Sequence, residues 1–252
     1  MPNWVRNVVK MEGIGSLPLY SAYDAEQKKW HDSIEYFDFQ KLIPMPEALN
    51  LTAGSVETVA IEAAIRRIAS AEGVPGFPAA RSSYAPKGET IEERAERNGM
   101  TLQEAEELGL KYLENAFWYG HTTWYGWCCE NWGTKWNSTG LQRIDDDTII
   151  FDTAWSNPEP IIAALSAQYP DRMIEHWWAD EDVGENTGYR CIQDGCRDDV
   201  LYDGGSQEAL ETYAMCWGMD ERLERDESGN LHIIEESDEE EMTGNADVLC
   251  TG

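Results

Sequence analysis

Short apolar runs separated by turn residues predict a series of strands along this chain. A group of valines predicts a first strand over 4–11, and the run TIIFDTAW predicts a stronger strand over 148–155. A β-rich segment at 133–137 precedes the second run, so we expect the polar connection between them to close a hairpin. Further strands are expected over residues 172–178, 189–193 and 200–203.

Other segments have the spacing of amphipathic helices. Residues 55–72 carry an apolar stripe, with Ser55 as the expected N-cap. Residues 90–119 follow, and within them Thr101 and Glu104 form a capping-box pattern. Shorter helices are expected over residues 22–36 and 161–168 and from Ser206 onward.

The order of these elements predicts an α+β fold. Strand, strand, helix and strand across 133–178 make half of a ferredoxin-like sandwich, in which an antiparallel sheet packs with helices. We interpret the helices between about residues 48 and 130 as an insertion into that core. One domain is therefore expected over 1–217. An acidic tail over 218–252 should follow it, partly disordered because it contains a run of like charges.

Four short motifs stand in order over residues 1–160. They are MPNW at 1–4, FDF and LIPMPE within 37–47, NWGTKWN at 131–137 and TAWS at 153–156. In this order they resemble the YubB-type family of ferredoxin-like proteins carried by phages and conjugative plasmids. The resemblance implies a ferredoxin-like fold and an origin in a mobile element, but no reaction and no catalytic residue. Two positions depart from the family's pattern: Val5 replaces an expected cysteine, and Asn157 separates Ser156 from its proline.

The charge of the chain limits the partners that we expect. The 252 residues include 48 acidic and 19 basic side chains, so the net charge is −29 and the pI is near 4.3. Binding to nucleic acid or to an anionic membrane requires clustered Lys and Arg, and this balance opposes both. A partner selected by charge would be a basic protein or a cation.

The start of the chain and its cysteines indicate a compartment. No signal peptide is expected, since residues 1–4 lead directly into an apolar strand, and no apolar run approaches the roughly 20 residues of a membrane span. Cys128 and Cys129 are adjacent and fit no zinc-binding pattern with the later cysteines. We therefore expect reduced thiols and a cytoplasmic protein in a bacterial host.

Rows of acidic residues are the candidate partner-binding surface. Two rows lie in predicted turns and a third lies in the tail. Their members are Asp145, Asp146, Asp147, Asp180, Glu181, Asp182, Glu235, Glu236, Asp238, Glu239, Glu240 and Glu241. Hard cations prefer carboxylate ligands, but neither turn matches a calcium-binding loop and acidic turns are usually solvated. No metal site is predicted.

Motifs for catalysis or for a cofactor are weak. Cys129, His121 and Glu130 can be drawn as nucleophile, base and acid, but no motif marks them as a triad. The chain has neither a GxxxxGK[ST] loop nor a GxGxxG turn, so it offers no phosphate-binding loop. Neither a catalytic residue nor a cofactor is predicted.

Six of the eleven tryptophans fall within residues 117–160. Five of them form a candidate aromatic ligand face: Trp124, Trp127, Trp132, Trp136 and Trp155. Such rings form a core, a platform on which a base can stack, or both, and core packing is the commoner role. A pocket lined by tryptophan and by Lys135 or Arg143 would favour ligand binding, whereas a closed core would oppose it.

These observations support three hypotheses about function. The first is a non-enzymatic acidic interaction protein of a phage or mobile element. Its carboxylates would occupy the basic groove of a host defence or nucleic-acid-processing protein in place of nucleic acid. The second is a small-molecule protein that binds a nucleotide signal on the tryptophan-rich face. The third is a metal-dependent hydrolase that uses the acidic rows. An acidic surface that serves only solubility also accounts for the charge.

Overall fold

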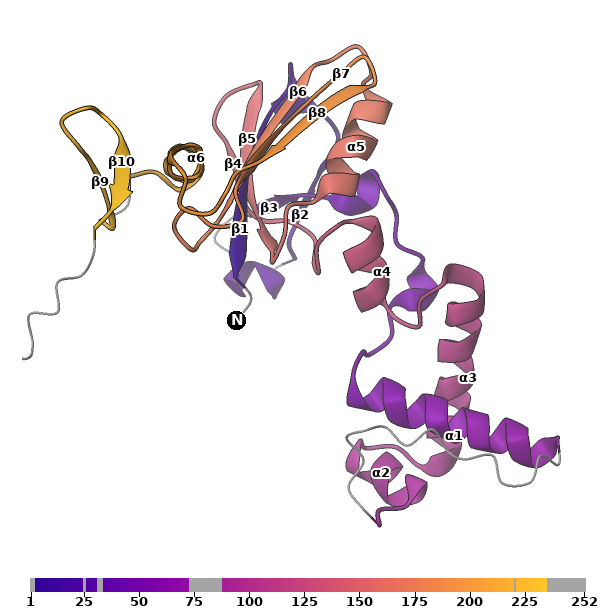
Figure 1. Cartoon of the computed structure of the whole chain (residues 1–252). Helices are drawn as coiled ribbons and strands as arrows, with labels where there is room; N and C mark the ends of the chain where they lie inside the picture. Colours follow the sequence, from indigo (N-terminus) through magenta and orange to yellow (C-terminus); the bar gives the residue numbers. More distant parts are fainter. Residues whose placement is uncertain (1–2, 25, 31–33, 73–87, 220, 235–252) are drawn as a thin grey trace, which may run out of the picture.

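A six-stranded antiparallel sheet forms the centre of the molecule, with the strand order β4-β5-β1-β6-β7-β8 (Figure 1). The computed structural model describes residues 3–24, 26–30, 34–72, 88–219 and 221–234. The six strands are β1 (Trp4–Lys10), β4 (Thr139–Arg143), β5 (Thr148–Ala154), β6 (Ile174–Asp180), β7 (Gly188–Gln193) and β8 (Cys196–Leu201).

β1 lies in the middle of this sheet because it is apolar on both faces. Val5 and Val9 are fully buried, while Val8 packs against the helix on the opposite face. β1 pairs antiparallel with β5, where Val8 lies opposite Ile150, and with β6, where Val8 lies opposite Trp177. The β4-β5 hairpin, a helix and β6 complete a ferredoxin-like arrangement around β1, and β7 and β8 extend it. The predicted fold class is confirmed.

Two helices, α4 (Trp124–Asn131) and α5 (Glu159–Gln168), cover one face of the sheet (Figure 1). Trp127 of α4 and Ile162 of α5 are buried in the same core cluster as Phe151 of the sheet. α4 is therefore held against the sheet, together with the turn that follows it.

The opposite face is covered by α6 (Gln207–Trp217), where Leu210 and Tyr213 pack against Val8. The helix begins after Ser206 as predicted, because the Ser206 hydroxyl accepts a hydrogen bond from a backbone N–H in the first turn at 3.2 Å. A two-stranded ribbon follows, made of β9 (Leu223–Arg225) and β10 (Leu231–Ile233). β10 is the strand expected near residue 231, whereas β9 was not expected.

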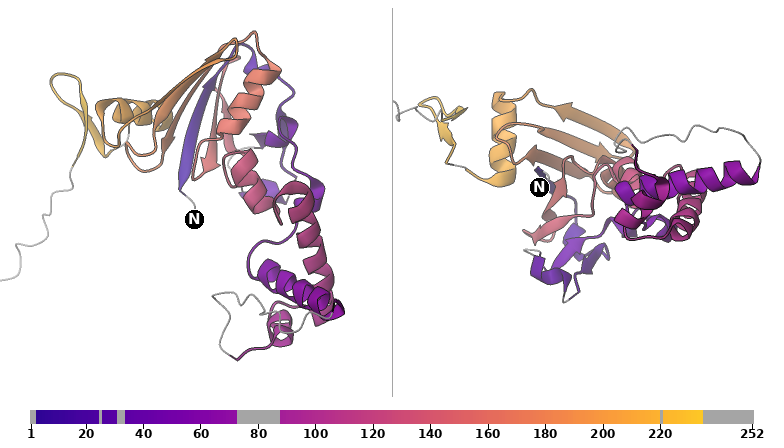
Figure 2. Two further views of the ribbon diagram at one scale, coloured as in Figure 1. Left: turned by 45° about the vertical axis from the view of Figure 1, so that its right-hand side comes forward. Right: turned by 90° about the horizontal axis from the view of Figure 1, so that it is seen from below.

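Three helices form a separate helical unit that projects away from the sheet (Figures 1 and 2). They are α1 (Ser55–Ala71), α2 (Ile91–Arg97) and α3 (Leu102–Tyr119). α1 and α3 cross so closely that a Cβ atom on Gly109 would lie 1.9 Å from the Ala60 carbonyl oxygen. Glu62 of α1 pairs with Arg94 of α2 at 2.5 Å, with both side chains only 5% exposed. This unit occupies the stretch expected as a helical insertion.

The segment predicted as a helix over 22–36 is different in the structure. Its described part contains β2 (Tyr20–Ala22), the 3-10 turn η2 (Gln27–Trp30) and β3 (Glu35–Phe37). β2 and β3 pair antiparallel as a ribbon, which places Tyr20 opposite Phe37. The helical prediction is wrong because long-range pairing overrides a local spacing of three apolar residues.

Two other local predictions are wrong. The first strand of the hairpin is β4 and not 133–137, since Gly133 has a φ of 76° that an extended strand does not allow. Ser55 is the first residue of α1 and not its N-cap, and its hydroxyl donates to Asn98 Oδ1 at 2.9 Å.

Three further 3-10 turns connect the elements: η1 (Ile14–Ser16), η3 (Phe39–Lys41) and η4 (Glu47–Leu49). Among the described residues, none of the helices combines the length and the apolar character needed to cross a membrane. The acidic run over residues 235–241 lies outside the described residues.

Candidate aromatic binding site

The five tryptophans of the predicted ligand face separate into core and surface. Trp127 and Trp132 are buried edge-to-face with ring centroids 5.9 Å apart, and the Trp132 indole N–H donates to a backbone carbonyl at 2.8 Å. These two rings are part of the core between α4 and the sheet, so the prediction of one exposed face is wrong for them. Trp124 is half-buried, whereas Trp136 and Trp155 are 37% and 44% exposed.

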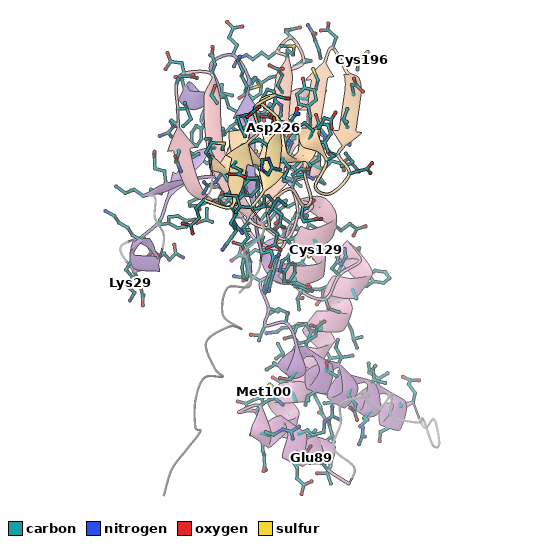
Figure 3. The ribbon with its side chains drawn as sticks, turned by 60° about the vertical axis from the view of Figure 1, so that its left-hand side comes forward. Lys29, Glu89, Met100, Cys129, Cys196 and Asp226 are labelled. Atoms are coloured by element: carbon teal, nitrogen blue, oxygen red, sulfur yellow. The ribbon has the colours of Figure 1, made fainter. Side chains whose placement is uncertain are left out.

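A hollow of about 230 Å³ opens beside the outer rings, and we call it the tryptophan hollow. Its walls include Trp124, Cys128, Trp132, Lys135, Trp136 and Asn137. It lies where α4 connects the sheet to the helical unit, a place marked in Figure 3 by Cys129, the next residue along α4. The structure thus contains a pocket lined by tryptophan and Lys135. Arg143 lies elsewhere, where it pairs with Glu35 at 2.6 Å.

Lys135 is surrounded by aromatic rings, and we call this arrangement the Lys135 cage. Its Nζ lies 4.4 Å from the ring centroid of Trp136, 4.6 Å from that of Trp155 and 5.6 Å from that of Tyr125. Such a contact stabilises an exposed lysine by about 0.5–1 kcal/mol. The Lys135 ammonium has no ion pair with any residue that the structure describes, although the chain has 48 acidic side chains.

The backbone at Trp155 is strained and firmly held. Its φ is 73°, in the left-handed region that costs a non-glycine residue about 1–3 kcal/mol. Trp155 N donates to Asn3 O at 2.9 Å, and Asn186 Nδ2 donates to Trp155 O at 3.3 Å. Ser156 Oγ donates to Gly133 O at 2.5 Å and ties the loop to the turn after α4. An indole that is largely exposed is therefore fixed in position by a disfavoured backbone.

A buried row of polar side chains crosses the sheet, and it was not predicted. His176 is fully buried, with Nε2 3.0 Å from Asn7 Oδ1, and Arg190 pairs with Asp199 at 3.0 Å. Burial, and secondly the charge of Arg190, lower the pKa of His176 well below its ordinary value. Strand alternation could have revealed the pairing, because His176 and Arg190 lie opposite each other in the β6-β7 hairpin. The row stabilises strand pairing, since each of these groups has a partner.

The structure separates the predicted acidic rows. Residues 145–147 lie beside the Lys10 end of β1, whereas residues 180–182 follow β6 beside the Trp4 end. The seven residues of β1 put the two rows roughly 20 Å apart, at about 3.3 Å per residue. Asp180 is buried, and its Oδ1 accepts the backbone N–H of Asp182 at 3.0 Å. Its carboxylate therefore shapes the turn and is not available to a partner, which corrects that prediction.

The set of Cys129, His121 and Glu130 does not have the character of a catalytic triad. His121 Nε2 is hydrogen-bonded to the Glu130 carboxylate. Desolvation raises the pKa of the Cys129 thiol, and the nearby Lys135 opposes this only in part, whereas a nucleophilic cysteine needs a lowered pKa. Within the described ranges, no three His, Cys, Asp or Glu side chains are grouped so that they could hold a metal ion.

Excess negative charge is concentrated in β6 to β10 and α6, which we call the acidic side. Its described residues, from 171 to 234, include sixteen Asp and Glu against five Arg and no Lys, and thirteen of the sixteen are exposed. The arginines already have partners within the protein: Arg172 with Glu12 O, Arg190 with Asp199, Arg197 with Glu159, Arg222 with Tyr213 and Arg225 with Glu211. The outer surface therefore presents carboxylates.

Comparison with known proteins supports the ferredoxin-like fold. Residues 131–243 match the model of a family described as the ferredoxin-like domain in Api92-like protein. The match begins at the end of α4 and covers every later strand of the sheet, but it excludes β1 and the helical unit. This chain is therefore similar to Api92-like proteins over just under half of its length.

One solved structure is also similar in part. The crystal structure of a protein Api92 from Yersinia pseudotuberculosis aligns with 82% of this chain and 100% of its own, at 14% sequence identity and a TM-score of 0.31. At that score the likeness carries no weight for the fold or for the site. No match is found among the curated proteins.

Proposed function

We propose that the protein is a non-enzymatic interaction protein that binds a basic protein through its acidic side. The observation that carries this proposal is the concentration of exposed carboxylates over residues 171–234, where every arginine has a partner within the protein. Unpaired exposed carboxylates attract a basic surface and accelerate its association. The acidic run over residues 235–241 continues from this side along the sequence.

The partner that we propose is a host defence or nucleic-acid-processing protein. The groove of such a protein is built to hold phosphates, and rows of carboxylates can occupy it in their place. The resemblance of the sequence motifs to the YubB-type family supports an origin in a phage or conjugative plasmid. We propose a place in the host cytosol for the same reason.

A pull-down from bacterial lysate at low and at about 0.5 M salt tests the proposal, because exposed charge contacts are largely screened at high salt. The test variant carries Asp198→Asn, Glu221→Gln and Glu227→Gln, three exposed acids of the acidic side. The matched control carries Glu72→Gln, Glu96→Gln and Glu114→Gln, three exposed acids of the helical unit.

We expect the native protein and the control to retain a basic nucleic-acid-binding protein at low salt, and the test variant to lose it. Equal retention by both variants would show that the acidic side is not the binding surface. If only acidic or neutral proteins were retained, the proposed partner class would be wrong.

A second candidate function is the binding of a small molecule, which the tryptophan hollow specifically favours. It is a concave site with aromatic walls and one cationic side chain, a combination typical of ligand pockets. Native mass spectrometry of the purified protein tests this function. We expect a bound species of defined mass, and we expect Trp136→Leu to lose it. If native protein and variant had the same mass apart from the substitution, the hollow would be unoccupied and this candidate would fail.

A further inference from the structure

We infer that the Lys135 cage and the tryptophan hollow together bind a planar aromatic ligand that carries a negative charge, of which a nucleoside monophosphate is an example. This inference rests on the second candidate function and names the class of its ligand. Lys135 and Trp136 belong to both the cage and the hollow, so the two features form one continuous site.

The rings set the shape of the ligand. Trp136 and Trp155 both face the Lys135 Nζ, at 4.4 and 4.6 Å, so two exposed indoles converge on one point. Stacking of a base on an aromatic ring is a stronger contact than that between an exposed lysine and such a ring. A planar ring can therefore displace the Lys135 side chain from between the indoles. The volume of about 230 Å³ is below the range of drug-sized pockets, which suits a single ring system.

The charge of Lys135 sets the charge of the ligand. Although the chain has a net charge of −29, this ammonium is held by rings and is paired with no carboxylate of the described residues. Once displaced by a ring, it is available to pair with an anionic group on the same ligand. A cationic ligand would instead meet the charge of Lys135 at close range.

The backbone at Trp155 independently marks this place as a site. Disfavoured backbone conformations that persist are concentrated at binding and active sites. Here the left-handed residue has a large side chain that is 44% exposed, so little core packing compensates for the strain. Glycine adopts a φ of 73° without cost. Trp155→Gly should therefore leave the fold as stable as before or more stable, while it removes one wall of the site.

Isothermal titration calorimetry of the full chain tests the inference with four probes. Adenosine 5′-monophosphate has the ring and the charge, adenosine has only the ring, and ribose 5-phosphate has only the charge. A short single-stranded oligothymidylate distinguishes a free nucleotide from nucleic acid as the source of the same chemistry. We expect the monophosphate to bind at least about tenfold more tightly than adenosine, and we expect no heat from ribose 5-phosphate or the oligonucleotide.

Three variants complete the test. Lys135→Met should bind adenosine and its monophosphate equally, because methionine keeps contact with the rings but has no charge. Trp155→Gly should lose binding of the monophosphate by at least about tenfold and keep or raise the melting temperature. Lys111→Met removes an exposed lysine from α3 and should bind as the native protein does.

Each other outcome overturns the inference in a distinct way. Equal affinity of native protein for adenosine and its monophosphate would leave a small-molecule site but exclude the charge of the ligand. Binding of the oligonucleotide alone would identify nucleic acid as the ligand. No heat with any probe would refute the aromatic anion, whereas the mass of a bound species tests the second candidate function separately. A lower melting temperature of Trp155→Gly with unchanged affinity would show that Trp155 serves packing alone.

Discussion

The buried ion pair between Glu62 and Arg94 gives the sharpest prediction about stability. Both side chains are 5% exposed, and Glu62 has a second partner in Arg66, which is 43% exposed. Arg94→Met leaves the Glu62 carboxylate buried beside that outer partner alone. Removal of one member of a buried pair costs about 3–5 kcal/mol, and we expect about 3 kcal/mol because Arg66 remains. The core of the helical unit is small and includes three alanines, so this loss is large for the unit.

Hydrogen exchange of backbone amides in α1 and α2 measures this loss directly, because it reports the free energy of opening one part of a protein. Glu62→Met combined with Arg94→Met replaces the pair with apolar side chains and should recover to within about 1 kcal/mol of the native value. Arg97→Met is the control, since it breaks an exposed pair with Glu89 and should cost less than about 1 kcal/mol. A double variant no more stable than Arg94→Met alone would refute the reasoning that an unpaired buried carboxylate causes the loss.

Three further predictions concern the helices and the sheet. Gly109→Ala should destabilise the helical unit by about 1–3 kcal/mol in urea unfolding followed by circular dichroism, because its Cβ overlaps the Ala60 carbonyl; an unchanged midpoint would contradict the close crossing. Thr101→Ala removes the hydroxyl that caps α3 and should cost about 1 kcal/mol in the same assay. Because the pKa of His176 is lowered on folding, the unfolded chain binds more protons below about pH 6.5. Stability should therefore fall as pH drops through that value, by up to about 1.4 kcal/mol per pH unit, and His176→Gln should abolish this fall.

The sequence was most informative where local chemistry decides structure. The hydroxyl of Thr101 and the carboxylate of Glu104 specify the start of α3 by themselves, and the alternating apolar residues of β5 and β6 specify strands buried in a sheet. It was least informative where distant segments decide. The spacing of apolar residues over 22–36 suits a helix, yet pairing of β2 with β3 determines the structure there.

The candidate site shows the same division. Sequence spacing could name Lys135 and the nearby tryptophans, but it could not distinguish buried Trp132 from exposed Trp136, because the contacts of Trp132 come from residues near position 43. The left-handed backbone of Trp155 has no sequence signal, since its hydrogen-bond partners Asn3 and Asn186 are far away along the chain. Likewise, the distance between the acidic rows depends on the whole length of β1.

The central place of β1 in the sheet has a consequence for synthesis on the ribosome. Val5 pairs with Thr153 and with Asp180, so the first strand to be made waits for partners nearly 150 residues later. At about 5–20 residues per second, that delay is roughly 7–30 s. The contacts among α1, α2 and α3 are close in sequence, and such local contacts form quickly. The helical unit therefore has time to fold on the nascent chain while β1 is still unpaired, and the sheet closes around its first strand only when β6 has emerged.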